Sequence, residues 1–169
     1  MATKYVTEVL KEINDDPSLL QTTYKPVGDG GPLGTLFKHA FMSQYKFLLP
    51  DGVPPFKPDP GPMGMTPGNF MKEMRRLYVF CSPTLTKGRR EQLFIQMVEG
   101  VHPDEAKILI AVKDQKLTDL YPNITRTVLS KSGFLPPLTP EEAAAEAATV
   151  KKSVKTSAPR KSASRQKAQ

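Results

Sequence analysis

Apolar residues recur along this chain at three- and four-residue spacing, which is typical of helices that bury one face. The first such segment spans residues 5–14 and ends at Asp15-Asp16-Pro17. A second segment spans residues 33–48. The expected buried positions are Val6, Val9, Leu10 and Ile13 in the first segment, and Leu33, Leu36, Phe37, Ala40, Phe41, Tyr45 and Leu48 in the second.

A third helix is predicted over residues 70–81. Asn69 has the short polar side chain that caps helix N-termini, and Ser82-Pro83 ends the segment. The expected apolar face comprises Phe70, Met74, Leu77, Tyr78 and Cys81. On the opposite side, three cations fall within about 100° of arc at 100° per residue. These cations are Lys72, Arg75 and Arg76.

Three further helices are expected over residues 87–99, 103–116 and 123–131. Gly100 and Gly133 follow the first and the last of them, as glycine does at many helix ends. The middle helix begins with proline at its first position and two acids in its first turn, which suits a helix N-terminus. The expected buried positions are Leu93, Phe94, Met97, Val98, Ala106, Leu109, Ile110, Ile124, Val128 and Leu129.

The segments between these helices have a different composition. Residues 21–32 are polar and glycine-rich and are interpreted as a loop. Residues 49–68, the proline-rich arm, hold seven prolines and four glycines among positions 50–68, which excludes a regular helix or a central strand. Thr139-Pro140-Glu141-Glu142 is a capping box that precedes an alanine-rich helix.

No strand signal of comparable strength is present, so the predicted fold class is all-α. We expect a small bundle of about five to six helices with a long Pro/Gly-rich arm and a disordered basic C-terminal tail. The predicted domains are a helical domain over residues 1–133, which includes the arm, a linker with the alanine-rich helix over residues 134–150, and the tail over residues 151–169.

Charge changes this picture only at the C-terminal end. Residues 150–169 hold seven cations and no acid. Removing those seven from the chain's 24 Lys and Arg residues leaves 17, which equals its 17 Asp and Glu residues. The pI near 9.5 therefore describes a basic tail on an electroneutral body. The tail cations are Lys151, Lys152, Lys155, Arg160, Lys161, Arg165 and Lys167.

The tail is the strongest candidate for nucleic-acid binding. Its Lys and Arg residues alternate with Ser, Ala and Pro, which cannot bury enough apolar area to offset chain entropy. Cations near phosphates release condensed counterions, so such a tail binds DNA or RNA without reading sequence. The alternative is a solubilising tail, and cationic tracts also bind acidic proteins and membrane surfaces.

Two other segments are candidate binding sites. A basic cluster in the body is predicted to line one surface for nucleic acid, although cations on a helix often serve only solvation. Its members are Lys72, Arg75, Arg76, Lys87, Arg89 and Arg90. In the proline-rich arm, Phe56, Met63 and Met65 are apolar anchors that either dock a partner protein or pack back on the helices.

Catalytic chemistry has little support in the residues. His102 is explained as a helix cap beside Pro103, and nothing in the spacing pairs His39 with Cys81. The single cysteine excludes an internal disulfide and is interpreted as a buried structural thiol. We therefore predict no catalytic residues, no metal site and no cofactor. No apolar run approaches the roughly 20 residues that span a bilayer, and a cytoplasmic, non-membrane protein is expected.

Several segments resemble an uncharacterised protein family of T-even-type tailed bacteriophages, including those of cyanobacteria. The resemblance rests on residues 77–81 (LYVFC), 91–106 (EQLFIQMVEGVHPDEA) and 112–117 (VKDQKL). Residues 5–10 and 48–56 fit the same family. The resemblance covers roughly residues 3–133 and does not include the tail. The resemblance implies a phage origin and the cytoplasm of an infected host cell, and it supplies no catalytic residues.

These observations favour a non-enzymatic phage accessory protein that contacts nucleic acid or a nucleic-acid machine, with the tail as an electrostatic tether. The alternative function is a protein-interaction adaptor that targets a host or phage protein through the helical body and the arm. A minor virion component is a third option. Oligomeric state cannot be read from the chain.

Overall fold

The computed structural model describes residues 4–62, 64–145 and 148. Within these residues the chain is helical and has no strand, so the all-α prediction is confirmed. The chain divides into two compact units, residues 1–137 and 138–169. Among the described residues, no helix has the length and apolar character needed to cross a bilayer.

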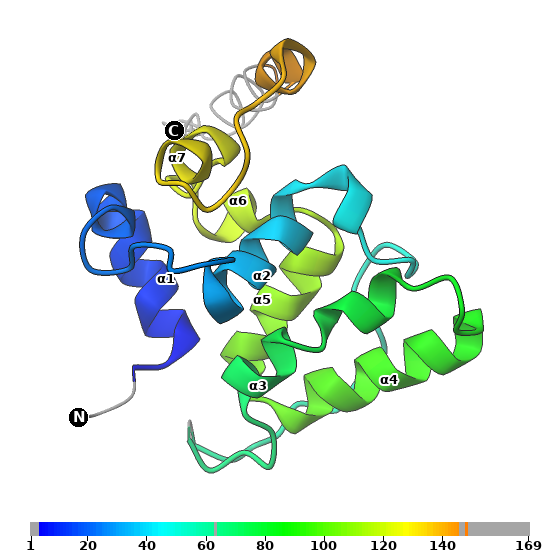
Figure 1. The fold of residues 1–169 in the computed structure, drawn as a ribbon. Helices are drawn as coiled ribbons and strands as arrows, with labels where there is room; N and C mark the ends of the chain where they lie inside the picture. The colour runs from blue at the N-terminus through cyan, green and yellow to red at the C-terminus, as the bar shows by residue number, and fades with distance from the viewer. Residues whose placement is uncertain (1–3, 63, 146–147, 149–169) are drawn as a thin grey trace, which may run out of the picture. The chain divides into compact units, whose positions relative to one another are not determined.

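Figure 1 shows the elements of the first unit. The α-helices are α1 (Val6–Asp15), α2 (Gly31–Phe41), α3 (Phe70–Met74), α4 (Lys87–Gly100), α5 (Pro103–Lys113), α6 (Leu117–Leu120) and α7 (Arg126–Lys131). Three 3-10 helices accompany them: η1 (Pro17–Leu20), η2 (Ser43–Tyr45) and η3 (Leu77–Cys81).

Helix α5 is the centre of the first unit, since it packs against α1, α2, α4 and α6. It buries residues on more than one side, including the apolar Ala106, Ile108, Leu109 and Val112. Two charged residues of the same helix, Glu105 and Lys113, are buried as well. Because α5 buries residues on several sides, it has no single apolar face from which burial can be predicted. Ile110, which was expected to be buried, is only partly buried.

The helix starts follow the local signals in the sequence. Asn69 accepts a hydrogen bond from the backbone N–H of Lys72 at 3.2 Å, and His102 Nδ1 accepts one from Asp104 at 3.2 Å. Both residues therefore cap helices as predicted. In the second unit, Thr139 and Glu142 exchange the two hydrogen bonds of a capping box, and residues 140–145 are helical.

Four predicted helices are shorter in the structure than in the prediction. Those expected over residues 103–116 and 123–131 become α5 (Pro103–Lys113) and α7 (Arg126–Lys131). The segment predicted over residues 33–48 ends at Phe41, and its Tyr45 and Leu48 are exposed rather than buried. The segment predicted over residues 70–81 breaks after Met74 and continues as the 3-10 helix η3.

The tighter winding of η3 determines which aromatic side chain enters the core. Residues three apart share a face in a 3-10 helix, so Leu77 and Phe80 are both buried. Tyr78, which was expected on the apolar face, is 66% exposed. Phe80 instead meets Phe94 of α4 with ring centroids 5.4 Å apart at 90°. This edge-to-face contact joins η3 to α4.

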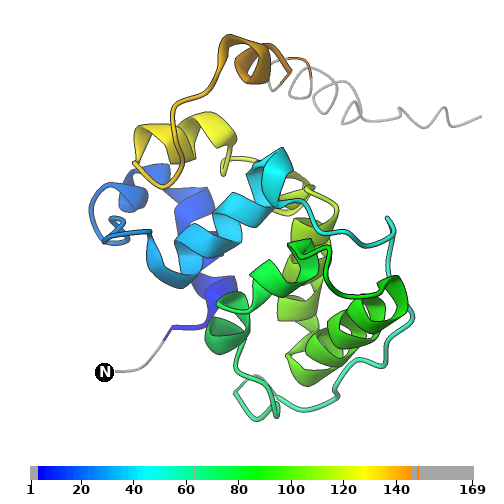
Figure 2. The same ribbon diagram turned by 45° about the vertical axis from the view of Figure 1, so that its right-hand side comes forward.

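The proline-rich arm passes along α4 before the chain enters α3, as Figure 2 shows. Its described residues contain no helix or strand, in agreement with the prediction. Lys57 N–H donates to Glu99 Oε1 at 3.0 Å, and Gly68 N–H donates to the Gly100 carbonyl at 2.6 Å. The second contact fixes the start of α3 beside the end of α4.

Candidate nucleic-acid interface

The three cations of the α3 region are exposed at the surface. Lys72 lies within α3, while Arg75 and Arg76 occupy the turn between α3 and η3. Arg76 Nη1 lies 3.4 Å from Glu73 Oε2, three positions earlier. Such an exposed pair contributes little to stability, so these cations are accessible to an anionic ligand.

Lys87 and Arg89 are also exposed, but they lie on the first turn of α4. Because α3 begins beside Gly100, Lys72 lies toward the C-terminal end of α4, whereas Lys87 and Arg89 lie at its N-terminal end. The 14 residues of α4 correspond to a length of about 21 Å. The exposed cations of the predicted cluster are therefore spread along α4, and that they bind nucleic acid stays a prediction.

Arg90, the sixth predicted member of the cluster, is 6% exposed. Its guanidinium donates to the carbonyls of Leu48 at 2.9 Å, Ser82 at 2.9 Å and Leu85 at 2.8 Å. Five donors in a planar fork suit this task, because the carbonyls approach from different segments. The prediction that Arg90 belongs to a nucleic-acid-binding surface is wrong, since the side chain holds loops together in the interior.

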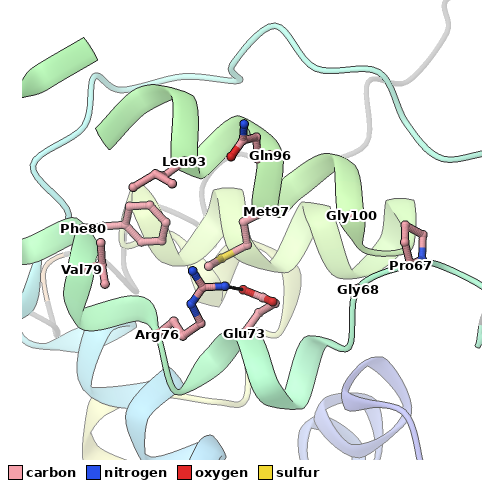
Figure 3. A pocket seen from close by; sticks show the side chains of 10 residues that line it. All are labelled: Pro67, Gly68, Glu73, Arg76, Val79, Phe80, Leu93, Gln96, Met97 and Gly100. Carbon is pink, nitrogen blue, oxygen red and sulfur yellow. Dashed lines mark hydrogen bonds and ion pairs between the residues drawn. The ribbon is translucent and has the colours of Figure 1, made fainter. Parts of the chain in front are cut away.

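A cavity of about 270 Å³ lies between the α3–η3 segment and α4, and Figure 3 shows the side chains that line it. Arg76 and Glu73 reach it from one side and Gln96 belongs to α4 on the other. The apolar part of the lining comprises Val79, Phe80, Leu93 and Met97. Among the predicted basic residues that the structure describes, only Arg76 lines this cavity.

The other cavity-lining residues were not predicted as functional. Leu93 and Met97 follow the helical spacing of buried residues, and Gln96 looks like any polar surface position in the sequence. The cavity exists because η3 and α4 run side by side, which depends on the break after Met74. No local sequence signal marks such a packing gap.

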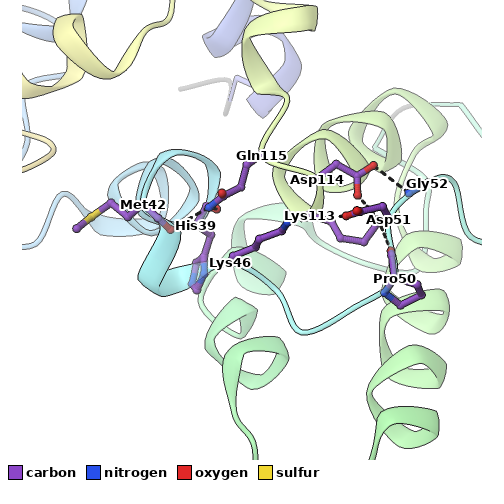
Figure 4. A network of polar contacts seen from close by, with 9 residues as sticks. All are labelled: His39, Met42, Lys46, Pro50, Asp51, Gly52, Lys113, Asp114 and Gln115. Carbon is purple, nitrogen blue, oxygen red and sulfur yellow. Dashed lines mark hydrogen bonds and ion pairs between the residues drawn. The ribbon is translucent and has the colours of Figure 1, made fainter. Parts of the chain in front are cut away.

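A polar network fastens the arm to the end of α5, as Figure 4 shows. The buried Lys113 donates from Nζ to the Pro50 carbonyl at 2.7 Å and also contacts the Asp114 carboxylate. Asp114 in turn accepts a hydrogen bond from the Gly52 N–H at 3.3 Å. A buried ammonium is stable only with such partners, so the network fixes the first residues of the arm.

The three predicted anchors of the arm have different surroundings. Phe56 is partly buried and packs against the core, which favours the packing alternative for this residue. Met65 is 78% exposed. Met63 lies outside the described residues. A further apolar residue of the arm, Val53, is 73% exposed.

His39 and Cys81 meet although their spacing gave no reason to pair them. Cys81 Sγ lies 3.4 Å from His39 Nδ1 and 3.1 Å from the Tyr45 carbonyl, and the same His39 nitrogen lies 2.9 Å from that carbonyl. Burial raises the pKa of Cys81 to about 11 and lowers the pKa of His39. Both shifts favour the neutral thiol and the neutral imidazole, which disfavours a reactive thiolate–imidazolium pair.

Within the described parts of the chain, no three His, Cys, Asp or Glu side chains gather as a metal site would require. The seven tail cations, Lys151, Lys152, Lys155, Arg160, Lys161, Arg165 and Lys167, lie outside the described residues, and so does the predicted disorder of the tail. Their charge is known from the sequence alone.

Comparisons with known proteins identify a family but no function. Searches of curated proteins and of solved structures find no match to this chain. Residues 26–119 match a family described as a family of unknown function, DUF6433. The matched region contains α2, α3, η3, α4 and α5, and therefore the cavity, the Arg90 contacts and the arm. The chain belongs to the DUF6433 family.

Proposed function

We propose that the protein binds nucleic acid electrostatically through residues 150–169 while its helical body acts as a separate module. The observation that carries the proposal is the segregation of charge: seven cations and no acid in those residues, beside a body with equal numbers of positive and negative side chains. A solubilising tail with no partner is the simplest competing explanation.

The physical basis is counterion release. Each cation that neutralises a phosphate frees a condensed ion, so affinity falls steeply as salt rises and depends little on sequence. With seven cations engaged on duplex DNA, the slope of log K against log salt is about −6. The helical body contributes the exposed Lys72, Arg75 and Arg76 on one of its surfaces.

The setting that fits this function is the cytoplasm of a phage-infected cell, where the protein acts as an accessory to nucleic acid or to a nucleic-acid machine. The segments that resemble a T-even-type phage family support this setting, and the DUF6433 match adds no activity to it.

The test compares the full chain with a truncated protein of residues 1–138. All the buried apolar residues of the described chain lie between Val6 and Leu135, so the truncation keeps the whole core. Binding to a labelled duplex is measured by fluorescence anisotropy at two salt concentrations. We expect the full chain to bind at low salt with a steep salt dependence and the truncation to bind far more weakly.

A full-length variant whose seven tail cations are changed to glutamine is the matched control, because it keeps the length of the tail and removes only its charge. It should behave like the truncation. If the full chain and the truncation are equally inert at low salt, the tether proposal is wrong.

A second candidate function is a protein-interaction adaptor. It is favoured by Val53 and Met65, two exposed apolar side chains on an arm that is fastened to α4 and α5. Capture from infected-cell lysate, with and without nuclease, separates the two functions. A bound protein that survives nuclease and is lost in Val53→Asp and Met65→Asp supports the adaptor, whereas nuclease-sensitive capture contradicts it.

A further inference from the structure

The cavity between η3 and α4 combines an apolar wall with polar groups that reach solvent. Phe80 and Met97 are buried, while Leu93 and Val79 are partly exposed and complete the apolar side. Gln96 and Arg76 are exposed, so the polar side of the cavity faces the surface. A concave site of this kind suits a flat ligand with apolar faces and a polar edge.

We propose that this cavity holds one base of a single-stranded nucleic acid, with the neighbouring phosphates against Lys72, Arg75 and Arg76. The inference rests on the proposed nucleic-acid function, and it specifies that the helical body recognises single strands rather than a duplex. It assigns a role to Gln96 that the sequence did not suggest.

Charge around the cavity favours an anionic ligand. The segment from α3 to the start of η3 carries three exposed cations and a single acid, Glu73, which pairs with Arg76. The Arg76–Glu73 pair lies at the surface, and its nitrogen–oxygen distance of 3.4 Å is long for a charged hydrogen bond. A phosphate can therefore replace Glu73 at the guanidinium with little loss of ion-pair energy. Two other cations, Lys72 and Arg75, have no acid within ion-pair distance in this region of the described chain.

The chemistry of a base matches the lining residues. An unstacked base has apolar faces that pack against side chains such as Met97 and Leu93. Its edge carries both donors and acceptors, and the amide of Gln96 offers both in return. Because every base has these features, such a site tolerates sequence variation.

A duplex fits this site poorly. Its bases are stacked and paired, and they reach a pocket only after costly flipping. Direct readout of a duplex usually places a helix in the major groove. Here the cations lie on the five-residue α3 and on the turn before η3, which is too short an element for that geometry.

The experiment uses the full-length protein and three labelled probes of equal length: an oligothymidine strand, a strand of abasic sites, and a duplex. The abasic strand keeps the phosphates and lacks the bases. We expect oligothymidine to bind at least about fivefold more tightly than the abasic strand, which is the lower end of what one base contributes when it stacks on an aromatic side chain, because Met97 and Leu93 are not aromatic.

Two substitutions and their matched controls locate the effect. Gln96→Ala and Arg76→Gln change exposed residues of the cavity. Gln92→Ala changes an exposed Gln of α4 outside it, and Lys107→Gln changes an exposed cation of α5 that, like Arg76, pairs with an acid three positions earlier. We expect Gln96→Ala to lower the preference for oligothymidine over the abasic strand by about two- to tenfold, as the loss of one hydrogen bond does. Arg76→Gln should weaken binding to both single strands, and both control variants should match the wild type.

Equal affinity of the wild type for the oligothymidine and abasic strands overturns this inference. The inference is also overturned if the Gln96→Ala protein, with an unchanged unfolding midpoint, keeps the wild-type preference for oligothymidine over the abasic strand. Neither result affects the tail proposal, which fails if the full-length protein leaves the duplex and both strands unbound at low salt, or if it binds them no better than the truncation does.

Discussion

The guanidinium of Arg90 donates a hydrogen bond of 2.9 Å to the carbonyl of Leu48, 42 positions earlier in the chain. The same side chain also binds the carbonyls of Ser82 and Leu85. It therefore joins three segments: the residues before the arm, the end of η3, and the loop that leads into α4. One buried cation fixes the geometry on which the cavity beside η3 depends.

Replacing Arg90 by methionine is expected to destabilise the protein by about 3 kcal/mol or more. Three carbonyls lose a charged donor in a partly buried setting, and each hydrogen bond to a charged group contributes about 1.5–3 kcal/mol. Denaturant unfolding measures the change. Arg89→Met is the matched control, because Arg89 is exposed and should change stability by about 0.5 kcal/mol or less. Equal stability of the two variants would contradict the structural role of Arg90.

Local signals explain why much of the fold could be predicted from the sequence. The caps at Asn69, His102 and Thr139 depend only on residues within the next turn, and all three form as predicted. The buried face of α1 was predicted in full, because its four apolar residues keep one helical period without interruption. Such features need no knowledge of the rest of the chain.

The sequence-based predictions are wrong where contacts with distant residues determine where a helix ends or whether a side chain is buried. Helix α2 ends at Phe41, and Gln115 donates to the carbonyls of Met42 at 2.9 Å and His39 at 3.4 Å from more than 70 positions away. Those bonds satisfy carbonyls that a longer helix would have used itself. In the candidate site, the exposure of Arg76 follows from its position in the sequence, while the burial of Arg90 depends on carbonyls of other segments.

Substituting Gly68 by alanine is expected to destabilise the protein by about 1–3 kcal/mol, as overpacking typically does. A Cβ at this position would lie 2.5 Å from the Gly100 carbonyl oxygen, and neither backbone can move without disturbing the contact between the start of α3 and the end of α4.

Gly88→Ala is the matched control for Gly68→Ala. Gly88 lies in α4, and apart from the adjacent residues and the helix's own backbone nothing comes within 4 Å of the place that an alanine methyl would take, so alanine should stabilise the helix by up to about 1 kcal/mol. Thermal and denaturant unfolding of both variants check the opposite signs. A Gly68→Ala protein as stable as the wild type would show that this backbone contact is not tight in solution.

Cys81 is expected to react slowly with iodoacetamide in the folded protein. The thiolate is the reactive form, and burial raises the pKa of Cys81 from its ordinary value of 9.0 to about 11. At neutral pH the thiolate fraction falls on the order of 100-fold, so alkylation should be slower than in the urea-unfolded chain by a similar factor. Mass spectrometry follows the rate. Equal rates in the two states would mean that His39 activates the thiol after all.

Glu105 should make stability depend on pH in a defined direction. Burial raises the pKa of this carboxyl in the folded protein above its ordinary value of 4.5. The folded state then binds more protons than the unfolded state between the two pKa values. The contribution of Glu105 to stability is therefore complete below the unfolded pKa and is lost as pH rises through the folded pKa.

Glu105→Gln tests this direction, because the amide keeps an acceptor oxygen for the start of α5 and does not ionise. We expect the variant to gain stability relative to the wild type as pH rises from about 4 to 7, since only the wild type must then bury a charge. Unfolding midpoints of both proteins are measured across this range, and the difference between them cancels the titration of all other groups. A difference that stays constant, or that shrinks as pH rises, would show that the Glu105 carboxylate is stabilised in the folded protein, with its pKa at or below the ordinary value.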